Sequence, residues 1–318
     1  MLKLSIVIPC YNEEKNISLF METCIKTFND SIKIEYIFIN DGSKDKTWES
    51  IKNINKKYLN YEIIGINFSR NFGKEAAMLA GLKKASGEYV AIIDADLQQH
   101  PKYIQKMLDF LLKNKEYDCV ACYPEKRIGN KKINLLSKLF YKIINKISDI
   151  DLYKNISDFR LMKRKMVNAI TNMQEYYRFS KGIFSFVGFN TYYMPYKVEK
   201  RKYGKSSWSL IKLIKYALGG IIDFSLTPLK IAIFTGTISF LLSIFYLIVI
   251  VVEKITTGTN ISGYSTIIFL ILFFGGLQMI FLGIIGEYLG RTYIETKKRL
   301  IYIIKDKFDS KTNEDEQL

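Results

Sequence analysis

The sequence predicts an α/β domain with a mixed, mostly parallel sheet, followed by a two-helix transmembrane hairpin. Short β-rich runs alternate with helical patterns through the first half of the chain, which is typical of a largely parallel sheet covered by helices. Several of these runs end in loops that are dense in polar groups. Two uncharged apolar stretches near the C-terminus are each long enough to cross a bilayer.

The β-rich runs and the helical patterns give the expected elements in order. Strands are expected at residues 4–8, 34–40, 62–68 and 89–93, and helices at about residues 14–27, 46–58 and 74–85. Ligands of such sheets gather at the carboxyl ends of the strands. The three polar loops that follow strands are residues 9–13, 40–45 and 94–99. We therefore expect these loops to form one pocket.

An acidic pair, Asp94 and Asp96, follows the run 89–93. That run is apolar throughout, as in a central strand covered on both faces. Two hard oxygen ligands one residue apart suit Mg²⁺ or Mn²⁺ carrying a diphosphate. An Asp-x-Asp triplet alone is a weak signal, and its position after a buried strand strengthens the prediction.

The other two loops allow two interpretations each. In the first, Asn12 and the loop amides could hold the edge of a base beside the Tyr11 ring, or the same residues could only cap a helix. In the second, Asp41 lies where a base amide or a ribose hydroxyl would be, although residues 40–43 could equally be a turn. Taken with the acidic pair, the loops indicate a nucleotide-diphosphate pocket.

The charge balance limits the classes of binding partner that the chain is expected to have. Lys and Arg number 47 against 31 Asp and Glu, a net charge of +16, which favours phosphates, nucleic acid or an anionic membrane face. Much of the excess flanks apolar segments, whereas nucleic-acid binders carry a basic recognition helix or interleaved aromatic and basic residues. We therefore expect no nucleic-acid partner. Residues 126–145 are basic and amphipathic, and fit either a solvated helix face or a helix at the membrane surface.

The C-terminal third predicts a membrane anchor. Residues 209–230 are expected to form an interfacial amphipathic helix, and residues 231–252, about 33 Å as a helix, a first span. After a short polar connector, a second span of about residues 267–286 completes a hairpin at 231–290. Lys and Arg flank both outer ends, which places residues 1–208 and 291–318 in the cytoplasm. The end of the chain, from about residue 306, is expected to be a disordered polar tail.

Six motifs, which include the three loops above, follow one another in an order that makes the chain recognisable. They are Ser5-Ile6-Val7-Ile8-Pro9 with Tyr11-Asn12-Glu13, Asn40-Asp41-Gly42-Ser43, Ser69-Arg70-Asn71-Phe72-Gly73-Lys74, Asp94-Ala95-Asp96-Leu97-Gln98, Ser157-Asp158-Phe159-Arg160-Leu161 and Arg201-Lys202-Tyr203-Gly204-Lys205-Ser206. Over nearly its whole length the chain resembles the polyisoprenyl-phosphate branch of glycosyltransferase family 2, whose catalytic domain has the GT-A fold. The closing residues 283–291 are similar to the glucosyltransferase side of that branch.

The resemblance implies roles for individual residues. The nucleotide sugar would be bound by Pro9, Tyr11, Asn12, Glu13, Asp41, Asp94, Arg201 and Lys205. The metal would be held by Asp94, Asp96 and Gln98, and Asp158 would lie near the reacting carbon as the third catalytic carboxylate beside Asp94 and Asp96. The lipid phosphate would meet Arg127, Lys132 and Ser137. Gln99 stands where the family has an acid, so one carboxylate near the metal is missing.

The implied reaction is the inverting transfer of a hexose, with glucose from UDP-glucose as first choice, onto undecaprenyl phosphate. It would take place at the cytoplasmic face of a bacterial inner membrane, by a homo-oligomeric, multi-pass protein, and supply a lipid-linked sugar for cell-envelope glycan modification. Mannose, N-acetylglucosamine or a modified arabinose are alternative sugars. A processive polysaccharide synthase lacks support because its Gln-x-x-Arg-Trp motif is absent. A non-enzymatic scaffold is disfavoured by the intact acidic pair.

Overall fold

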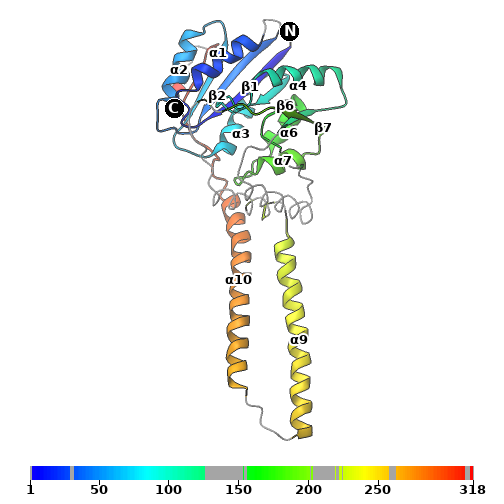
Figure 1. Ribbon diagram of the computed structural model, residues 1–318. Helices are drawn as coiled ribbons and strands as arrows, with labels where there is room; N and C mark the ends of the chain where they lie inside the picture. The colour runs from blue at the N-terminus through cyan, green and yellow to red at the C-terminus, as the bar shows by residue number, and fades with distance from the viewer. Residues whose placement is uncertain are drawn as a thin grey trace.

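The computed structural model describes residues 2–28, 32–125, 153, 156–200, 202, 219, 222–223, 225–257, 263–311 and 316–317. In these residues a twisted sheet is covered by helices on both faces. Two long helices, α9 (Thr227–Thr257) and α10 (Tyr264–Thr296), extend away from it side by side (Figure 1). The predicted α/β architecture with a C-terminal helical pair is confirmed.

The sheet is mixed, with a parallel centre. Its described strands run in the order β7-β5-β6-β4-β1-β2-β3-β8-β9. Strands β4, β1, β2 and β3 pair in parallel, while β6 pairs antiparallel with both β4 and β5. The strand bounds are β1 Lys3–Cys10, β2 Lys33–Asn40, β3 Glu62–Phe68, β4 Tyr89–Ile92, β5 Cys119–Pro124, β6 Arg160–Lys163, β7 Thr191–Tyr196, β8 Ile304–Asp309 and β9 Glu316–Gln317.

Helices cover both faces because the strand residues alternate between two cores. In β1, Leu4, Ile6 and Ile8 face the core formed with α1, α2 and α4, whereas Val7 faces the core formed with α3, α6 and α7. The helix bounds are α1 Ile17–Thr27, α2 Thr47–Lys57, α3 Lys74–Lys84, α4 Lys102–Lys113, α6 Arg164–Asn172, α7 Ser180–Phe186, α9 Thr227–Thr257 and α10 Tyr264–Thr296.

The prediction of a disordered tail from about residue 306 is wrong, because β8 joins the main sheet. It pairs antiparallel with β3, and its Phe308 is buried against Gly65 of β3, where a Cβ atom would lie 2.2 Å from the phenyl ring. Asp306 accepts a hydrogen bond from Asn67 Nδ2 at 2.8 Å. The chain therefore returns from the helical pair to complete the edge of the sheet, as its polar composition did not indicate.

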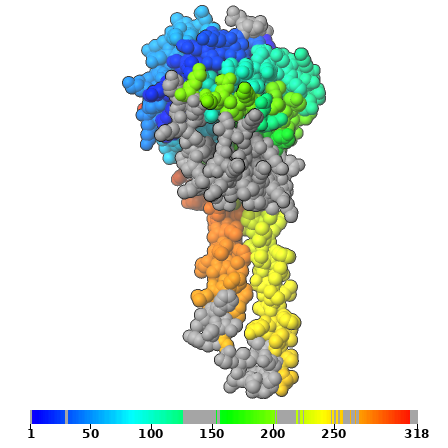
Figure 2. Space-filling model, in the orientation of Figure 1, coloured from blue at the N-terminus to red at the C-terminus, as the bar shows by residue number. Residues whose placement is uncertain are grey.

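The helical pair is long, apolar and exposed. Segments Thr227–Tyr246 and Leu270–Thr296 are each long and apolar enough to cross a membrane, and none of either is buried inside the protein. In the space-filling view the two helices extend well beyond the α/β domain (Figure 2).

Polar contacts fasten the base of α10 to its surroundings. Tyr288 donates a hydrogen bond to the carbonyl oxygen of Ser225, and Arg291 forms an ion pair with Asp223. Glu295 accepts a hydrogen bond from the backbone amide of Tyr176 at 2.8 Å. These contacts join the end of the apolar pair to the segment before α9 and to the α/β domain.

Candidate active site

A candidate reaction centre lies at the end of the β4–β6 pair. The antiparallel register of these strands ends with Ile92 opposite Arg160, so Asp94 and Asp158 each lie two residues beyond this last pair. Two carboxylates that are far apart in the sequence thus lie at the same end of this strand pair.

Lys74, the first residue of α3, bridges these two carboxylates. Its ammonium nitrogen lies 2.7 Å from Asp94 Oδ1 and 3.0 Å from Asp158 Oδ2. The three side chains are partly exposed, with 33% of Lys74, 30% of Asp94 and 18% of Asp158 accessible to solvent. The centre is therefore open to a ligand while most of its charged surface is enclosed.

The electrostatics differ between the two carboxylates. Burial raises the pKa of Asp94, and Lys74 opposes this shift. Burial acts in the same direction on Asp158, but the charges of Lys74, Lys181 and Arg160 outweigh it and lower the pKa of Asp158 to about 2. Asp158 is therefore fully ionised at neutral pH and a weak base.

One carboxylate oxygen of Asp158 has no hydrogen-bond partner among the described residues. This oxygen, Oδ1, is buried, and an unsatisfied buried carboxylate oxygen is costly unless a ligand uses it. The backbone around it is held by Arg160, which donates to the carbonyl oxygen of Ser157 at 3.2 Å and lies 3.4 Å from the Phe184 ring centre. The fold thus fixes Asp158 and leaves one of its oxygens without a partner in the part of the chain that the structure describes.

Asp41 holds a second loop of the candidate site in place through hydrogen bonds. Its carboxylate accepts hydrogen bonds from the Asn71 side chain and from the amides of Phe72 and Gly73. Burial raises the pKa of Asp41 to about 6, although the amides of Phe72 and Gly73 act to lower it. Next to it Gly42 has φ +59°, and a Cβ atom there would lie 2.2 Å from the carbonyl carbon of Arg70. Asp41 thereby positions the segment that leads into Lys74.

The first loop is tied to the second. Asn12 accepts a hydrogen bond from the Lys44 amide, and its own amide donates to Ser43 Oγ, both at 2.9 Å. The amide of Glu13 donates to Thr47 Oγ1 at 2.8 Å. Tyr11 is exposed and Pro9 is half-buried. The structure thus brings these predicted nucleotide-binding residues to the same edge of the sheet as Asp41 and the acidic pair.

The acidic pair fits a divalent cation that also binds a diphosphate. Asp96 is buried, and its Oδ1 accepts a hydrogen bond from the Gln98 amide at 3.0 Å. Asp94 already attracts a cation, the Lys74 ammonium. In the part of the chain that the structure describes, no three His, Cys, Asp or Glu side chains form a metal cage. Mg²⁺ is commonly held by one or two carboxylates and substrate phosphates, which matches this donor set.

The structure leaves part of the predicted site untested and adds to the rest. Arg127, Lys132, Ser137, Arg201 and Lys205 lie outside the described residues. Two side chains beside Asp94 had no role in the sequence prediction: Lys74, and Gln99, whose Oε1 accepts a hydrogen bond from the Asp94 amide at 3.1 Å. A signal for Lys74 existed, because a cation at the first position of a helix is unfavourable and needs another explanation.

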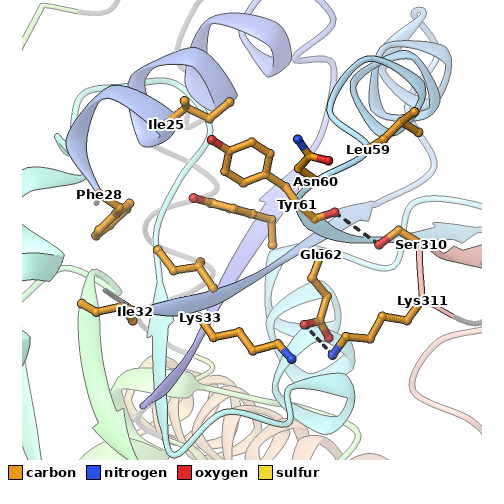
Figure 3. A pocket seen from close by; sticks show the side chains of 12 residues that line it. Ile25, Phe28, Ile32, Lys33, Leu59, Asn60, Tyr61, Glu62, Ser310 and Lys311 are labelled. Atoms are coloured by element: carbon orange, nitrogen blue, oxygen red, sulfur yellow. Dashed lines mark hydrogen bonds and ion pairs between the residues drawn. The ribbon is translucent and has the colours of Figure 1, made fainter. Parts of the chain in front are cut away.

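A pocket of about 330 Å³ lies elsewhere on the domain, between the end of α1, the starts of β2 and β3, and the residues after β8 (Figure 3). Ile25 and Phe28 line one side, and the ion pair between Glu62 and Lys311, 2.6 Å, closes another. Since Lys33 and Glu62 begin their strands, this pocket lies at the amino edge of the sheet, away from Asp94 and Asp158.

Comparisons with known proteins identify the family of the chain. The model of glycosyl transferase family 2 matches residues 5–171, and that of the GtrB C-terminal hairpin matches residues 227–292. The chain is 44% identical to the putative glycosyltransferase CsbB of Bacillus subtilis, over 95% of this chain and 91% of that protein. It is 37% identical to the bactoprenol glucosyl transferase of Shigella phage SfV, over 96% of this chain and 99% of that protein.

A solved structure shares the fold of the catalytic domain. Glucosyl-3-phosphoglycerate synthase from Mycobacterium tuberculosis, in complex with Mn²⁺, UDP-glucose and phosphoglyceric acid, aligns with a TM-score of 0.50 and 16% identity, covering 70% of this chain and 78% of that chain. The family match, the near full-length relatives and the carboxylate pair at the edge of the sheet lead to one conclusion. The chain belongs to glycosyltransferase family 2 and carries a GtrB-type C-terminal hairpin.

Proposed function

We propose that this glycosyltransferase moves glucose from UDP-glucose onto undecaprenyl phosphate with inversion at the anomeric carbon. One observation carries the proposal: Asp94 and Asp158 share the Lys74 ammonium at the end of the β4–β6 pair, in a chain that also holds two apolar helices. Near full-length similarity to proteins named bactoprenol glucosyl transferase supports the choice of sugar and lipid.

The acceptor determines what Asp158 has to do. A phosphate monoester has a second pKa near 6 and is mostly dianionic at neutral pH, so it needs little deprotonation. Asp158, whose pKa is lowered to about 2, would orient the acceptor or stabilise positive charge at the anomeric carbon. The phosphate oxygen attacks this carbon as its bond to UDP breaks, so one displacement inverts the configuration.

The remaining residues would bind the two substrates. The nucleoside would lie against Tyr11 and the loops held by Asn12, Glu13 and Asp41, while Arg201 and Lys205 would meet the diphosphate. Asp94, Asp96 and Gln98 would hold Mg²⁺ or Mn²⁺, which when bound neutralises charge on the departing diphosphate. Arg127, Lys132 and Ser137 would meet the lipid phosphate.

The membrane topology belongs to the same proposal. The apolar pair would span the cytoplasmic membrane as a hairpin, with the catalytic domain and both termini in the cytoplasm. Support comes from the basic residues that flank the outer ends of the pair and from the match to the GtrB hairpin.

The test is transfer by the purified full-length protein to undecaprenyl phosphate from a panel of nucleotide sugars. We expect a lipid-linked product from UDP-glucose that needs Mg²⁺ or Mn²⁺ and disappears in excess chelator. Transfer from GDP-mannose or UDP-N-acetylglucosamine in place of UDP-glucose would reassign the sugar. Failure with every donor, or full activity in chelator, would contradict the proposed chemistry.

A further inference from the structure

Lys74 occupies a position that helix stability does not explain. A positive charge in the first turn of a helix opposes the helix dipole, whereas an acidic residue is favoured there. Glu75, the next residue, supplies such an acid and binds the amide and hydroxyl of Ser180. The reason for a lysine must therefore lie in its contacts with Asp94 and Asp158.

The ammonium stands where a metal would need access. Asp94 belongs to the acidic pair, yet its Oδ1 lies only 2.7 Å from Lys74 Nζ. A divalent cation and an ammonium repel each other strongly at such distances, so both cannot share this oxygen. Asp158, at 3.0 Å from Nζ, gives the ammonium a second partner that is outside the acidic pair.

We propose that Lys74 is a built-in counterion of the reaction centre. In the donor-free protein its ammonium competes with the divalent cation for Asp94. When cation and donor bind, the Lys74 ammonium breaks its ion pair with Asp94, keeps its ion pair with Asp158 and positions that carboxylate. This second step rests on the proposed transfer reaction, whereas the competition at Asp94 does not.

The negative charge on Asp158 explains why Lys74 should remain paired with it when the acceptor binds. The acceptor phosphate brings a dianion toward a carboxylate that is ionised at neutral pH. An ammonium held on that carboxylate reduces the repulsion between the two anions. Lys74 is thus a positioning residue that acts through Asp158.

The first arm of the test measures Mn²⁺ binding to the donor-free, full-length protein by electron paramagnetic resonance. Lys74→Met removes the competing charge, so we expect Mn²⁺ to bind about tenfold more tightly. Lys74→Arg keeps the charge and should stay close to wild type. Lys83→Met, an exposed lysine of the same helix, is the matched control. Unchanged or weaker Mn²⁺ binding by a folded Lys74→Met protein would overturn the competition.

The second arm measures transfer to undecaprenyl phosphate at saturating Mn²⁺. Lys74→Met should lower kcat about a hundredfold and change the KM for UDP-glucose much less, with partial rescue in Lys74→Arg. An unaltered kcat, or a loss confined to the donor KM, would contradict the role at Asp158. Wild-type protein that transfers nothing would refute the proposed function instead, and the Mn²⁺ comparison, which uses no lipid, would still decide the competition.

Discussion

Asp94 could be assigned from the sequence alone, whereas its partners could not. An acidic pair directly after an apolar strand is visible in the chain. Its meeting with Asp158 depends on the antiparallel register of β4 and β6, which no local pattern specifies. Asp158 was found only through a motif resemblance, and Lys74 stood in a motif without a role. Neither role could be predicted from local sequence, because contacts between residues far apart in the chain bring Asp158 and Lys74 to Asp94.

For the single residue Asp158, the substitution Asp158→Asn should lower the rate of the chemical step and leave donor binding unchanged. The substitution removes the charge that orients the acceptor but leaves Asp94, Asp96 and the nucleoside loops in place. We expect kcat to fall about a hundredfold or more, while the dissociation constant of UDP-glucose stays within about twofold. Steady-state kinetics combined with calorimetric titration of UDP-glucose measures both. An equal loss of UDP-glucose binding would move Asp158 into the donor pocket.

Among the elements, the central strands and their helices were predictable and β8 was not. The runs that became β1 to β4 are apolar and sharply bounded. By contrast, β8 reads Ile-Lys-Asp-Lys-Phe-Asp, a polar sequence that looks like a solvated tail. Its place in the sheet comes from pairing with β3 and from the burial of Phe308, which are tertiary effects that override local propensity.

Strand β8 also reaches the nucleoside loops through hydrogen bonds. Asp306 accepts from Asn67, and Asn67 in turn accepts from Asn40 Nδ2 at 2.7 Å. Asn40 accepts from the Ser43 hydroxyl at 2.5 Å, and Ser43 holds the Asn12 amide. A residue that follows the apolar pair in the sequence thus supports the loop that we assign to the nucleoside.

We therefore predict that Asp306→Ala weakens donor binding without touching the carboxylate centre. It leaves the Asn67 amide without this acceptor, at a cost of about 1–3 kcal/mol, and loosens the loop. The KM for UDP-glucose should rise several-fold and kcat change little. Lys305→Ala, an exposed neighbour on the same strand, controls for general damage to β8. Identical kinetics in both variants would show that the hydrogen-bond chain has no influence on the pocket.

For the molecule as a whole, the apolar pair is an insertion within the catalytic fold. The sheet receives β8 after α10, so removing everything after Leu226 would expose the edge of β3 and delete Phe308. An exposed strand edge promotes aggregation. The catalytic domain can be separated from the membrane only if β8 is kept.

An internal deletion tests what the apolar pair contributes. A flexible linker replacing residues 227–296 should leave a domain that binds UDP-glucose like the full chain. It should transfer poorly to undecaprenyl phosphate in liposomes, because losing the anchor lowers the effective concentration of the acceptor. A short, soluble isoprenyl phosphate should recover part of the rate.

Truncation after Leu226 is the comparison, and we expect it to give unstable protein. Thermal unfolding and donor titration distinguish the two designs. Full-speed transfer to undecaprenyl phosphate in liposomes by the internal deletion would show that the apolar pair does not deliver the acceptor.

The central claim, direct displacement by a lipid phosphate at the Asp94–Asp158 centre, is tested most directly by the anomeric configuration of the product. The full-length protein, supplied with UDP-glucose and undecaprenyl phosphate, should form a lipid-linked glucose whose anomeric proton and phosphorus couplings in nuclear magnetic resonance spectra identify a β-glucosyl phosphate. Asp158→Asn should form the same product more slowly. An α-linked product would show retention, which one inverting displacement cannot give, and free glucose without lipid product would indicate hydrolysis; either result would contradict this account.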